Sequence, residues 1–420
     1  MNGILFWIWL NLCCTPGSGT FDLLLRAFSS PYEIYDADEE TLRDALSRYD
    51  RDLARLLNKD IEAAKRILTY CSVRGVTLIP YDDPRYPTAL RTIPSPPVLL
   101  YCRGRLPQMN GRLSVAVVGT RKMSEYGKRM TFSVARDLAR AGAIVVSGMA
   151  LGIDAVANAA AINGGGETVA VLGSGIDVVY PAVHARLAEF IERHGAVITE
   201  FPPGTRPEGK NFPIRNRIIS GLAQATAVME ADLKSGSLIT ARRALQQERA
   251  LYAMPGRVDE EGSEGPCMLI RNGAKILTSA DDILTDFEKR FSDKINIFRL
   301  LERSPYVIDK VLHSMRVSAK GEKVKREKAP APTPSPAPMP KAAPTESAEA
   351  TERISAILAK IGGKSEEMYR MIPADGGITC DEIADAGIPI TDVMVLSAQM
   401  EIYELIELLP GGQMRRKALH

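Results

Sequence analysis

The sequence predicts an α/β protein whose central domain is a doubly wound, parallel sheet. Between residues 113 and 278, short runs of β-branched and other apolar residues alternate with longer segments of helical pattern. Continuous apolar runs are typical of parallel strands that helices cover on both faces. The runs that we expect to be strands are 114–119 (SVAVVG), 143–148 (AIVVSG), 168–173 (TVAVLG), 196–200 (AVITE), 226–231 (TAVMEA) and 250–256 (ALYAMPG).

Length and composition leave room for two or three domains and give no global charge signal. The chain has 420 residues, 45% of them apolar, and 53 Lys and Arg balance 51 Asp and Glu, so any anion site must come from local clusters. The six cysteines form no C-x-x-C pair and no metal-like cluster with the four histidines. This usage is typical of a reducing compartment, and we expect no metal and no cofactor.

Residues 1–75 carry helical patterns with short breaks, and we interpret them as a helical domain of the SAM or helix-hairpin-helix kind. The run ILFWIWLNL at 4–12 predicts a buried helix. An export signal is the alternative, with Cys13 as a lipidation site, but no Lys or Arg precedes the run and no cleavage pattern follows it. The break TPGSGT at 15–20 reads as a plain turn or as a glycine hairpin that binds phosphate.

The central domain is expected to span residues 76–288. It starts with a proline-rich lead-in over 76–90 and 96–104. A short piece at 268–277, MLIRNGAKIL, is expected to close it.

The C-terminal part reads as a linker followed by a winged-helix domain. Residues 289–350 are basic and then Pro/Ala-rich, a composition typical of an extended spacer. In 351–420 a first helix (EEMYRMI) precedes ITCDEIADA, where Thr379 and Glu382 form a capping box. A turn (GIPI), a helix capped by Thr391 and a hairpin wing (IELLPGGQMRRK) follow. A three-helix protein-interaction module is the alternative.

The loop after the first expected strand points to an anionic ligand. VAVVGTRKMSEYG, residues 115–127, resembles the start of a dinucleotide site, but Arg121 stands where such a site needs its second glycine. Arginine offers a bidentate fork for a phosphate or a base edge. A purely structural turn is the alternative for this G-x-R pattern.

Further basic loops follow the other strands, and these loops meet at one edge of an open α/β sheet. The loop FPPGTRPEGKNFPIRNR carries Arg206, Lys210, Arg215 and Arg217 against Glu208 alone. DLKSGSLITARR begins a helix whose free N–H groups suit phosphate. Aromatic side chains stand among these charges, at Phe212 and Tyr126, and bases stack on such rings. Several basic loops on one edge favour an extended polyanion, single-stranded nucleic acid, over a compact cofactor.

Acidic side chains in the same loops leave an enzymatic function as an alternative hypothesis. Asp154 and Asp177 are either catalytic acids or residues that cap helices and orient arginines. GSGID at 173–177 lacks the third glycine of a dinucleotide fingerprint, and Tyr180 with Pro181 reads as a turn.

The motifs together resemble the DprA (Smf) family of DNA-processing proteins. They occur in the order GTRKMSEYG, SGMALGIDAVAN, VAVLGSGIDVVYP, NFPIRNRIISGL, EADLKSGSLITARRAL and AMPG. The resemblance implies a Rossmann-like, cytoplasmic homodimer that is not an enzyme. It also implies a protein that protects incoming single-stranded DNA and loads the RecA recombinase in natural transformation or recombination.

The resemblance also implies which residues bind DNA, and the basic loops add neighbours to them. The expected DNA-binding residues are Gly119, Thr120, Arg121, Ser124, Ser147, Gly148, Lys210, Asn211, Phe212, Arg215, Asn216, Arg217, Lys234, Ser235, Gly236 and Ser237.

The sequence departs from the family pattern at several positions, and two rival functions remain. Leu151 replaces the usual arginine, Asn158 a histidine and Ala182 a basic residue. One rival is a nucleotide phosphoribohydrolase that would use Glu230 or Glu200. The other is a duplex-DNA regulator driven by the winged helix.

Overall fold

The computed structural model describes residues 3–46, 50–292 and 294–296, and part of the C-terminal segment. The ranges described there are 354–355, 357–359, 361–362, 364–374, 377–379, 382–383, 386–388, 393, 396–397, 400, 405–409 and 413–417. The chain forms two compact units, Met1–Glu322 and Lys323–His420. Most of the predicted linker, 297–350, lies outside the described residues.

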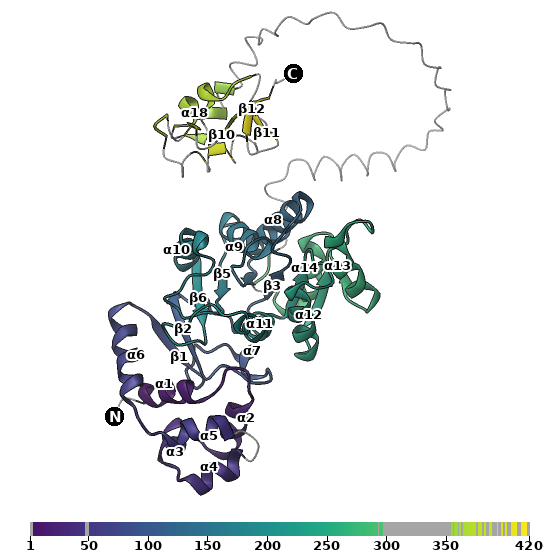
Figure 1. Ribbon diagram of the computed structural model, residues 1–420. Helices are drawn as coiled ribbons and strands as arrows, with labels where there is room; N and C mark the ends of the chain where they lie inside the picture. Colours follow the sequence, from purple (N-terminus) through teal and green to yellow (C-terminus); the bar gives the residue numbers. More distant parts are fainter. Residues whose placement is uncertain are drawn as a thin grey trace, which may run out of the picture. The chain divides into compact units, whose positions relative to one another are not determined.

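The first unit is built on a nine-stranded sheet in the order β1-β2-β6-β5-β4-β3-β7-β8-β9. Figure 1 labels β1, β2, β6, β5 and β3 of this sheet. The strands from β6 to β9 along this order are parallel, and β1 and β2 add antiparallel pairs at one edge. The strands are β1 (Thr77–Pro80), β2 (Leu99–Gly104), β3 (Ser114–Val118), β4 (Ile144–Ser147), β5 (Thr168–Val171), β6 (Gly195–Thr199), β7 (Ala225–Val228), β8 (Ala250–Ala253) and β9 (Lys275–Ile276). All six predicted strands are therefore confirmed, and the doubly wound α/β fold with them.

The lead-in differs from the prediction, because its two proline-flanked segments are strands β1 and β2 of the same sheet. Thr77 pairs with Cys102 and Tyr101 with Thr199, so the hairpin extends the sheet beyond β6. The closing piece 268–277 supplies the end of a helix and the edge strand β9.

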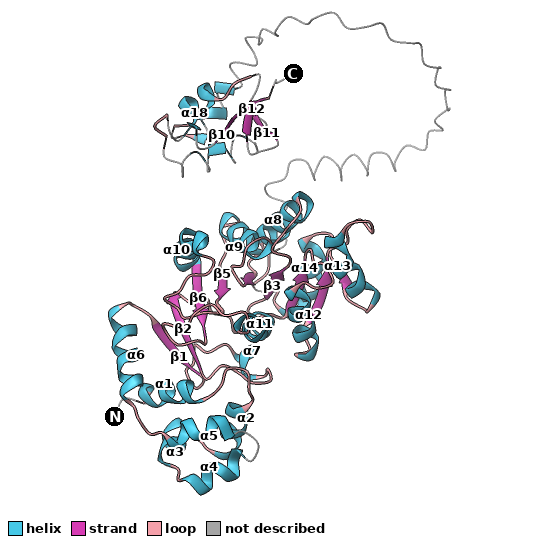
Figure 2. Cartoon of the chain, viewed as in Figure 1, coloured by secondary structure: helices cyan, strands magenta, loops and turns pink. Residues whose placement is uncertain are grey.

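Helices cover both faces of the sheet, as Figure 2 shows by colour. One face packs against α8 (Glu125–Arg140), α9 (Ile153–Asn163), α10 (Ala185–His194) and α14 (Ala280–Phe287). The other packs against α7 (Thr88–Arg91), α11 (Asn211–Leu222), α12 (Gly236–Gln246) and α13 (Glu261–Arg271). The central strand β3 is buried along its whole length, which explains its unbroken apolar sequence. Two short 3₁₀ turns are η1 (Ala182–His184) and η2 (Glu288–Arg290).

The domain extends past its expected end at residue 288. Phe291 and Ile295 are buried among the side chains that pack under α8 and α14. The amide of Asn296 donates to the carbonyl of Ala141. The first residues of the predicted linker thus belong to the core of the first unit.

The N-terminal helices share a core with the sheet. They are α1 (Ile4–Cys13), α2 (Thr20–Ala27), α3 (Pro31–Asp36), α4 (Glu39–Leu46), α5 (Asp50–Leu57) and α6 (Glu62–Val73). Trp9 and Leu10 of α1 are buried in the cluster that contains Leu99 and Tyr101 of β2. The prediction of a buried helix over 4–12 is confirmed. Among the described helices, none is both long and apolar enough to cross a bilayer.

The second unit contains a short helix and a small antiparallel sheet. Helix α18 (Ser365–Met371) packs in a core with β11 (Ile406–Leu409) and β12 (Gln413–Arg416), and β10 (Ile378–Thr379) pairs with β12. The predicted hairpin is confirmed, and so is the capping box, since the Thr379 amide donates to Glu382 (2.8 Å) and the Glu382 amide to Thr379 Oγ1 (3.3 Å). Thr391 lies outside the described residues, and the winged-helix assignment stays a prediction.

Candidate nucleic-acid interface

A cleft of about 610 Å³ opens at the carboxyl edge of the parallel strands. The chain winds from β3 to β6 in one direction and then returns to place β7 on the other side of β3. The loops after β3 and β7 therefore diverge, and open α/β sheets bind their ligands at such a switch point. The predicted residues that line the cleft are Gly119, Thr120, Arg121, Phe212, Arg215, Asn216, Ser235, Gly236 and Ser237.

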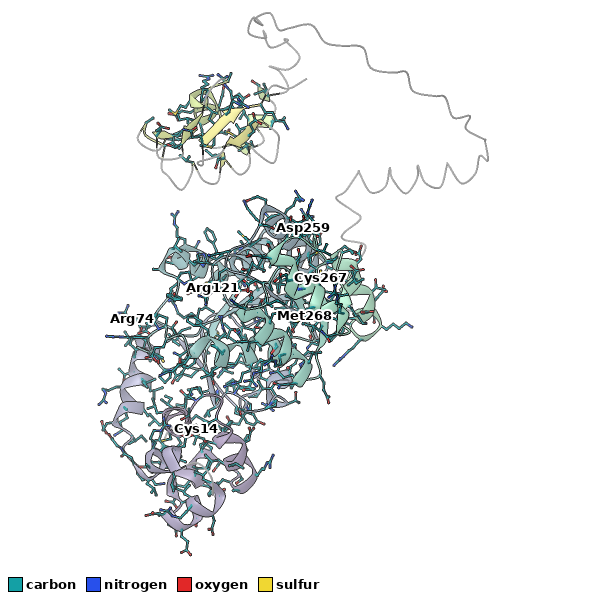
Figure 3. The ribbon with its side chains drawn as sticks, turned by 45° about the vertical axis from the view of Figure 1, so that its right-hand side comes forward. Cys14, Arg74, Arg121, Asp259, Cys267 and Met268 are labelled. Atoms are coloured by element: carbon teal, nitrogen blue, oxygen red, sulfur yellow. The ribbon has the colours of Figure 1, made fainter. Side chains whose placement is uncertain are left out.

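An aromatic ring with two guanidinium groups forms one wall of this cleft. The guanidinium carbon of Arg121 (labelled in Figure 3) lies 5.4 Å from the Phe212 ring centroid, and that of Arg215 lies 5.8 Å from it. The Tyr180 ring is tilted against Phe212 at 5.5 Å. Cation–π pairs of this kind contribute about 0.5–2 kcal/mol, and more as they lose water. Arg121 is exposed and Phe212 half-buried, so both remain accessible to a ligand.

Arg215 is fixed from behind by backbone carbonyls. Its Nη1 donates to the carbonyl oxygens of Gly148 (2.8 Å) and Val171. Burial lowers the pKa of Arg215 to about 10, although nearby Asp154 opposes that change. Burial likewise raises the pKa of Asp154, against the effect of Arg215 and of the Gly148 amide, which donates to it (3.1 Å). Asp154 thus places negative charge near the buried Arg215 and holds the Gly148 amide.

The opposite wall is the beginning of α12. Ser235 caps this helix and accepts from the Ser237 amide (3.4 Å), and the Asn216 amide group donates to the Gly236 carbonyl (3.3 Å). A side chain at Gly236 would meet no atom within 4 Å, so its backbone faces open space. The first N–H groups of a helix lack partners within it and carry partial positive charge, which suits a phosphate.

Comparison with known proteins identifies the family. Residues 77–288 match the pattern of a family described as DNA recombination-mediator protein A. This segment is half of the chain and contains the whole cleft. The chain belongs to this family. Its role is accordingly that of a DNA recombination mediator.

Individual relatives agree with this assignment. The DNA processing protein DprA of Bacillus subtilis is 37% identical over 225 residues, which are 54% of this chain and 76% of that protein. Protein Smf of Escherichia coli is 44% identical over 57% of this chain and 64% of its own length. The X-ray structure of DprA from Streptococcus pneumoniae matches with a TM-score of 0.58 at 32% identity, covering 67% of this chain and 96% of that one. The Rossmann-like α/β fold of the recombination-mediator family is thus shown for the first unit.

Two predicted serines lie outside the cleft because they hold the scaffold of the mediator fold. Ser124 caps α8 and its amide donates to Glu230 (3.0 Å). Ser147 is buried and its hydroxyl donates to the Val117 carbonyl (2.7 Å). Gly148 lines a small recess beside the cleft that shares Arg121 with it.

Three further predicted residues stand next to the cleft but do not line it. Lys210 is exposed and pairs with Glu208 (2.7 Å). Asn211 is buried, and its side-chain amide donates to the Arg206 carbonyl (3.2 Å), which orders the long loop. Lys234 is exposed, one residue before the cap of α12.

Arg217 requires a correction, since it is predicted to bind DNA but points into the protein. It is 4% exposed and pairs with Glu200, which is 3% exposed. Residues 215 and 217 stand about 200° apart around a helix, so only one of the two can face the cleft. Burial raises the pKa of Glu200, and Arg217 opposes that rise.

The acidic side chains that the hydrolase hypothesis would use form other contacts in the structure. The Glu230 carboxylate accepts from the Ser124 amide and hydroxyl and lies against the backbone of Gly127 and Gly262. Neither Glu230 nor Glu200 lines the cleft. Asp177 accepts from the Gly204 amide (2.8 Å) and so fastens a loop.

The sequence predicts a turn at Tyr180 and Pro181, but the Tyr180 ring lines the cleft against Phe212. An aromatic residue in a loop after a strand was the available signal. Lys122 also lines the cleft, and Leu151, 47% exposed, lies in the recess beside it.

The glycine hairpin at 15–20 is filled by an internal carboxylate. Buried Asp52 accepts from the Thr15 amide (3.0 Å) and from the hydroxyls of Thr15 (2.6 Å) and Ser18 (3.2 Å). Because the Asp52 carboxylate accepts hydrogen bonds from the groups that a phosphate would need, the structure favours the interpretation of residues 15–20 as a plain turn.

Proposed function

We propose that the cleft binds single-stranded DNA without cleaving it. The observation that carries this proposal is the half-buried Phe212 ring in the cleft, with the guanidinium groups of Arg121 and Arg215 close to it. An unpaired base can stack on such a ring for about 1–3 kcal/mol, whereas a duplex keeps its bases stacked on one another. The arginines and the start of α12 supply donors for the phosphates on either side.

The proposal extends to the site residues. Arg121 and Phe212 contact the strand directly, and Gly119, Thr120, Asn216 and the turn 235–237 bind its backbone. Arg215 contributes charge from a buried position. Lys210 and Lys234 attract the strand from the rim, and Asn211, Ser124, Ser147 and Gly148 hold the loops in place.

The test is fluorescence anisotropy with labelled oligo-dT, comparing Arg121→Ala with the unchanged protein. We expect a loss of about 1–3 kcal/mol, or roughly 5- to 150-fold in Kd, with a salt slope reduced by about 0.7. Arg66→Ala on α6 removes an equal charge from an exposed helix and serves as the matched control. Equal affinity of the Arg121 and Arg66 variants would contradict the proposal.

The wider role is a cytoplasmic, non-enzymatic mediator that protects incoming single strands and loads the RecA recombinase during transformation or recombination. The relatives named DNA processing protein DprA support it. We expect single-stranded DNA to be recovered intact after incubation with the protein. We also expect recombinase filaments to form faster on that DNA. Release of ribose 5-phosphate from a nucleotide monophosphate would contradict the non-enzymatic part.

We also propose a homodimer and a winged-helix C-terminal domain. The edge strand β9 leaves Ile276 55% exposed, and Met268 on α13 is 36% exposed. An exposed edge strand with exposed apolar side chains on it and on α13 favours pairing with a second copy. Sedimentation equilibrium should give twice the mass of one chain.

The hairpin of β11 and β12 supports the wing, and deletion of 351–420 should leave oligo-dT binding in place.

A further inference from the structure

The outer face of α10 carries an exposed stripe of basic and apolar side chains. We call Val183, Arg186, Phe190 and Arg193 the α10 stripe. Arg186, Phe190 and Arg193 follow the i, i+4, i+7 spacing that places side chains on one face of a helix. Val183 is 74% exposed and Phe190 48% exposed, while Ala188 and Ile191 bury the other face of the helix against the sheet. These apolar side chains are therefore accessible to a ligand.

The charges on this face are mostly without partners. The Arg193 guanidinium lies over the Phe190 ring at 5.6 Å from its centroid. Within the described part of the chain, neither Arg186 nor Arg193 pairs with a carboxylate. Glu192 pairs with Arg103 (3.2 Å) beside this face. Glu189 is the exposed carboxylate that stands near the two arginines of the stripe. The stripe repeats the arrangement of the cleft, with an accessible ring beside arginine.

The stripe begins where the cleft ends. Tyr180 lines the cleft and packs on Phe212, and Val183 follows it after two residues. The 3₁₀ turn η1, which contains Val183, ends at His184, whose Nδ1 lies 2.9 Å from the Met149 carbonyl oxygen. From Val183 in η1 to Arg193 in α10 the chain rises by about 15 Å, away from the carboxyl edge of the sheet, because β6 begins directly after α10.

We propose that the α10 stripe is a second binding surface for the same DNA strand. On leaving the cleft past Tyr180, the strand follows α10, with phosphates on Arg186 and Arg193 and a base stacked on Phe190. A length of about 15 Å accommodates roughly three or four nucleotides at 3.4 Å or more each. This inference rests on the proposed function of the cleft, and continuity with the cleft and the unpaired positive charge identify the occupant as nucleic acid.

The test compares oligo-dT of two lengths on the full-length protein by anisotropy, roughly 5 and roughly 20 nucleotides. Arg193→Ala should weaken binding of the longer strand about five- to tenfold and lower its salt slope by about 0.7. Phe190→Ala should weaken it by a similar factor with the slope unchanged. Both variants should bind the short strand as the unchanged protein does, and Arg66→Ala is again the charge-matched control.

The outcomes separate this inference from the proposed function. If the unchanged protein binds neither length, the function of the cleft fails. If the variants bind both lengths normally, the stripe inference alone is overturned, and the same holds if they lose both lengths equally. Normal DNA binding with slower recombinase filament formation would assign the stripe to a protein partner and also overturn it. Equal melting temperatures should accompany each comparison.

Discussion

The buried pair of Glu200 and Arg217 allows a direct test of whether Arg217 belongs to the core and not to the cleft. Glu200→Gln would remove the only carboxylate that pairs with Arg217 among the described residues, and Arg217 is 4% exposed. Removal of one partner leaves an uncompensated buried charge, which costs about 3–5 kcal/mol. For a unit of this size that corresponds to a fall in Tm of roughly 6–15 °C.

Urea denaturation followed by circular dichroism would measure the loss. The double variant Glu200→Leu with Arg217→Met should recover most of it, since apolar replacement of a buried pair is often neutral or stabilising. Three atoms of the pair, Oε1 of Glu200 and Nε and Nη1 of Arg217, already lack partners, which favours that recovery. Oligo-dT affinity of the folded double variant should be unchanged. A loss of affinity as large as that of Arg121→Ala would refute the assignment of Arg217 to the core.

Three more results are expected. Burial raises the pKa of Asp154, so the carboxylate takes up its proton at a higher pH than usual and the negative charge near Arg215 disappears. Oligo-dT affinity should therefore rise as the pH falls through the acidic range. The affinity of Asp154→Asn should not change over the same range. Phe212→Leu should weaken oligo-dT binding by about 1–3 kcal/mol without altering its salt slope, because no charge is lost; a changed slope would argue against stacking. Gly127→Ala places a Cβ 1.8 Å from Oε2 of Glu230 and should lower stability by about 1–3 kcal/mol in urea denaturation, whereas an unchanged midpoint would show that the carboxylate moves aside freely.

The central sheet was predictable because its strands are short, apolar on both faces and separated by helices. The hairpin β1–β2 was not, since prolines at 80, 84, 87, 94, 96 and 97 interrupt the pattern that identifies a strand. Its place in the sheet depends on pairing with β6, more than ninety residues later in the sequence. Such long-range pairing leaves no local signal.

The position of the cleft followed from the rule that ligands bind beyond the carboxyl ends of parallel strands. The roles of individual side chains did not follow from it. Arg215 and Arg217 look alike in sequence, and only the packing of α11 decides which one meets Glu200 and which one meets Phe212. Ser124 and Ser235 are both serines that cap helices after strands, but Glu230 occupies the donors of the first alone.

The core that joins α1 to β2 has a practical consequence for fragment design. A protein that started at residue 76 would retain every residue of the cleft, yet it would leave Leu99 and Tyr101 without Trp9 and Leu10 above them. Asn11 would also be missing, and with it the hydrogen bonds to the Tyr101 hydroxyl and the Glu200 carbonyl. Such a fragment should be prone to aggregate, and binding studies on it would report the behaviour of a damaged scaffold.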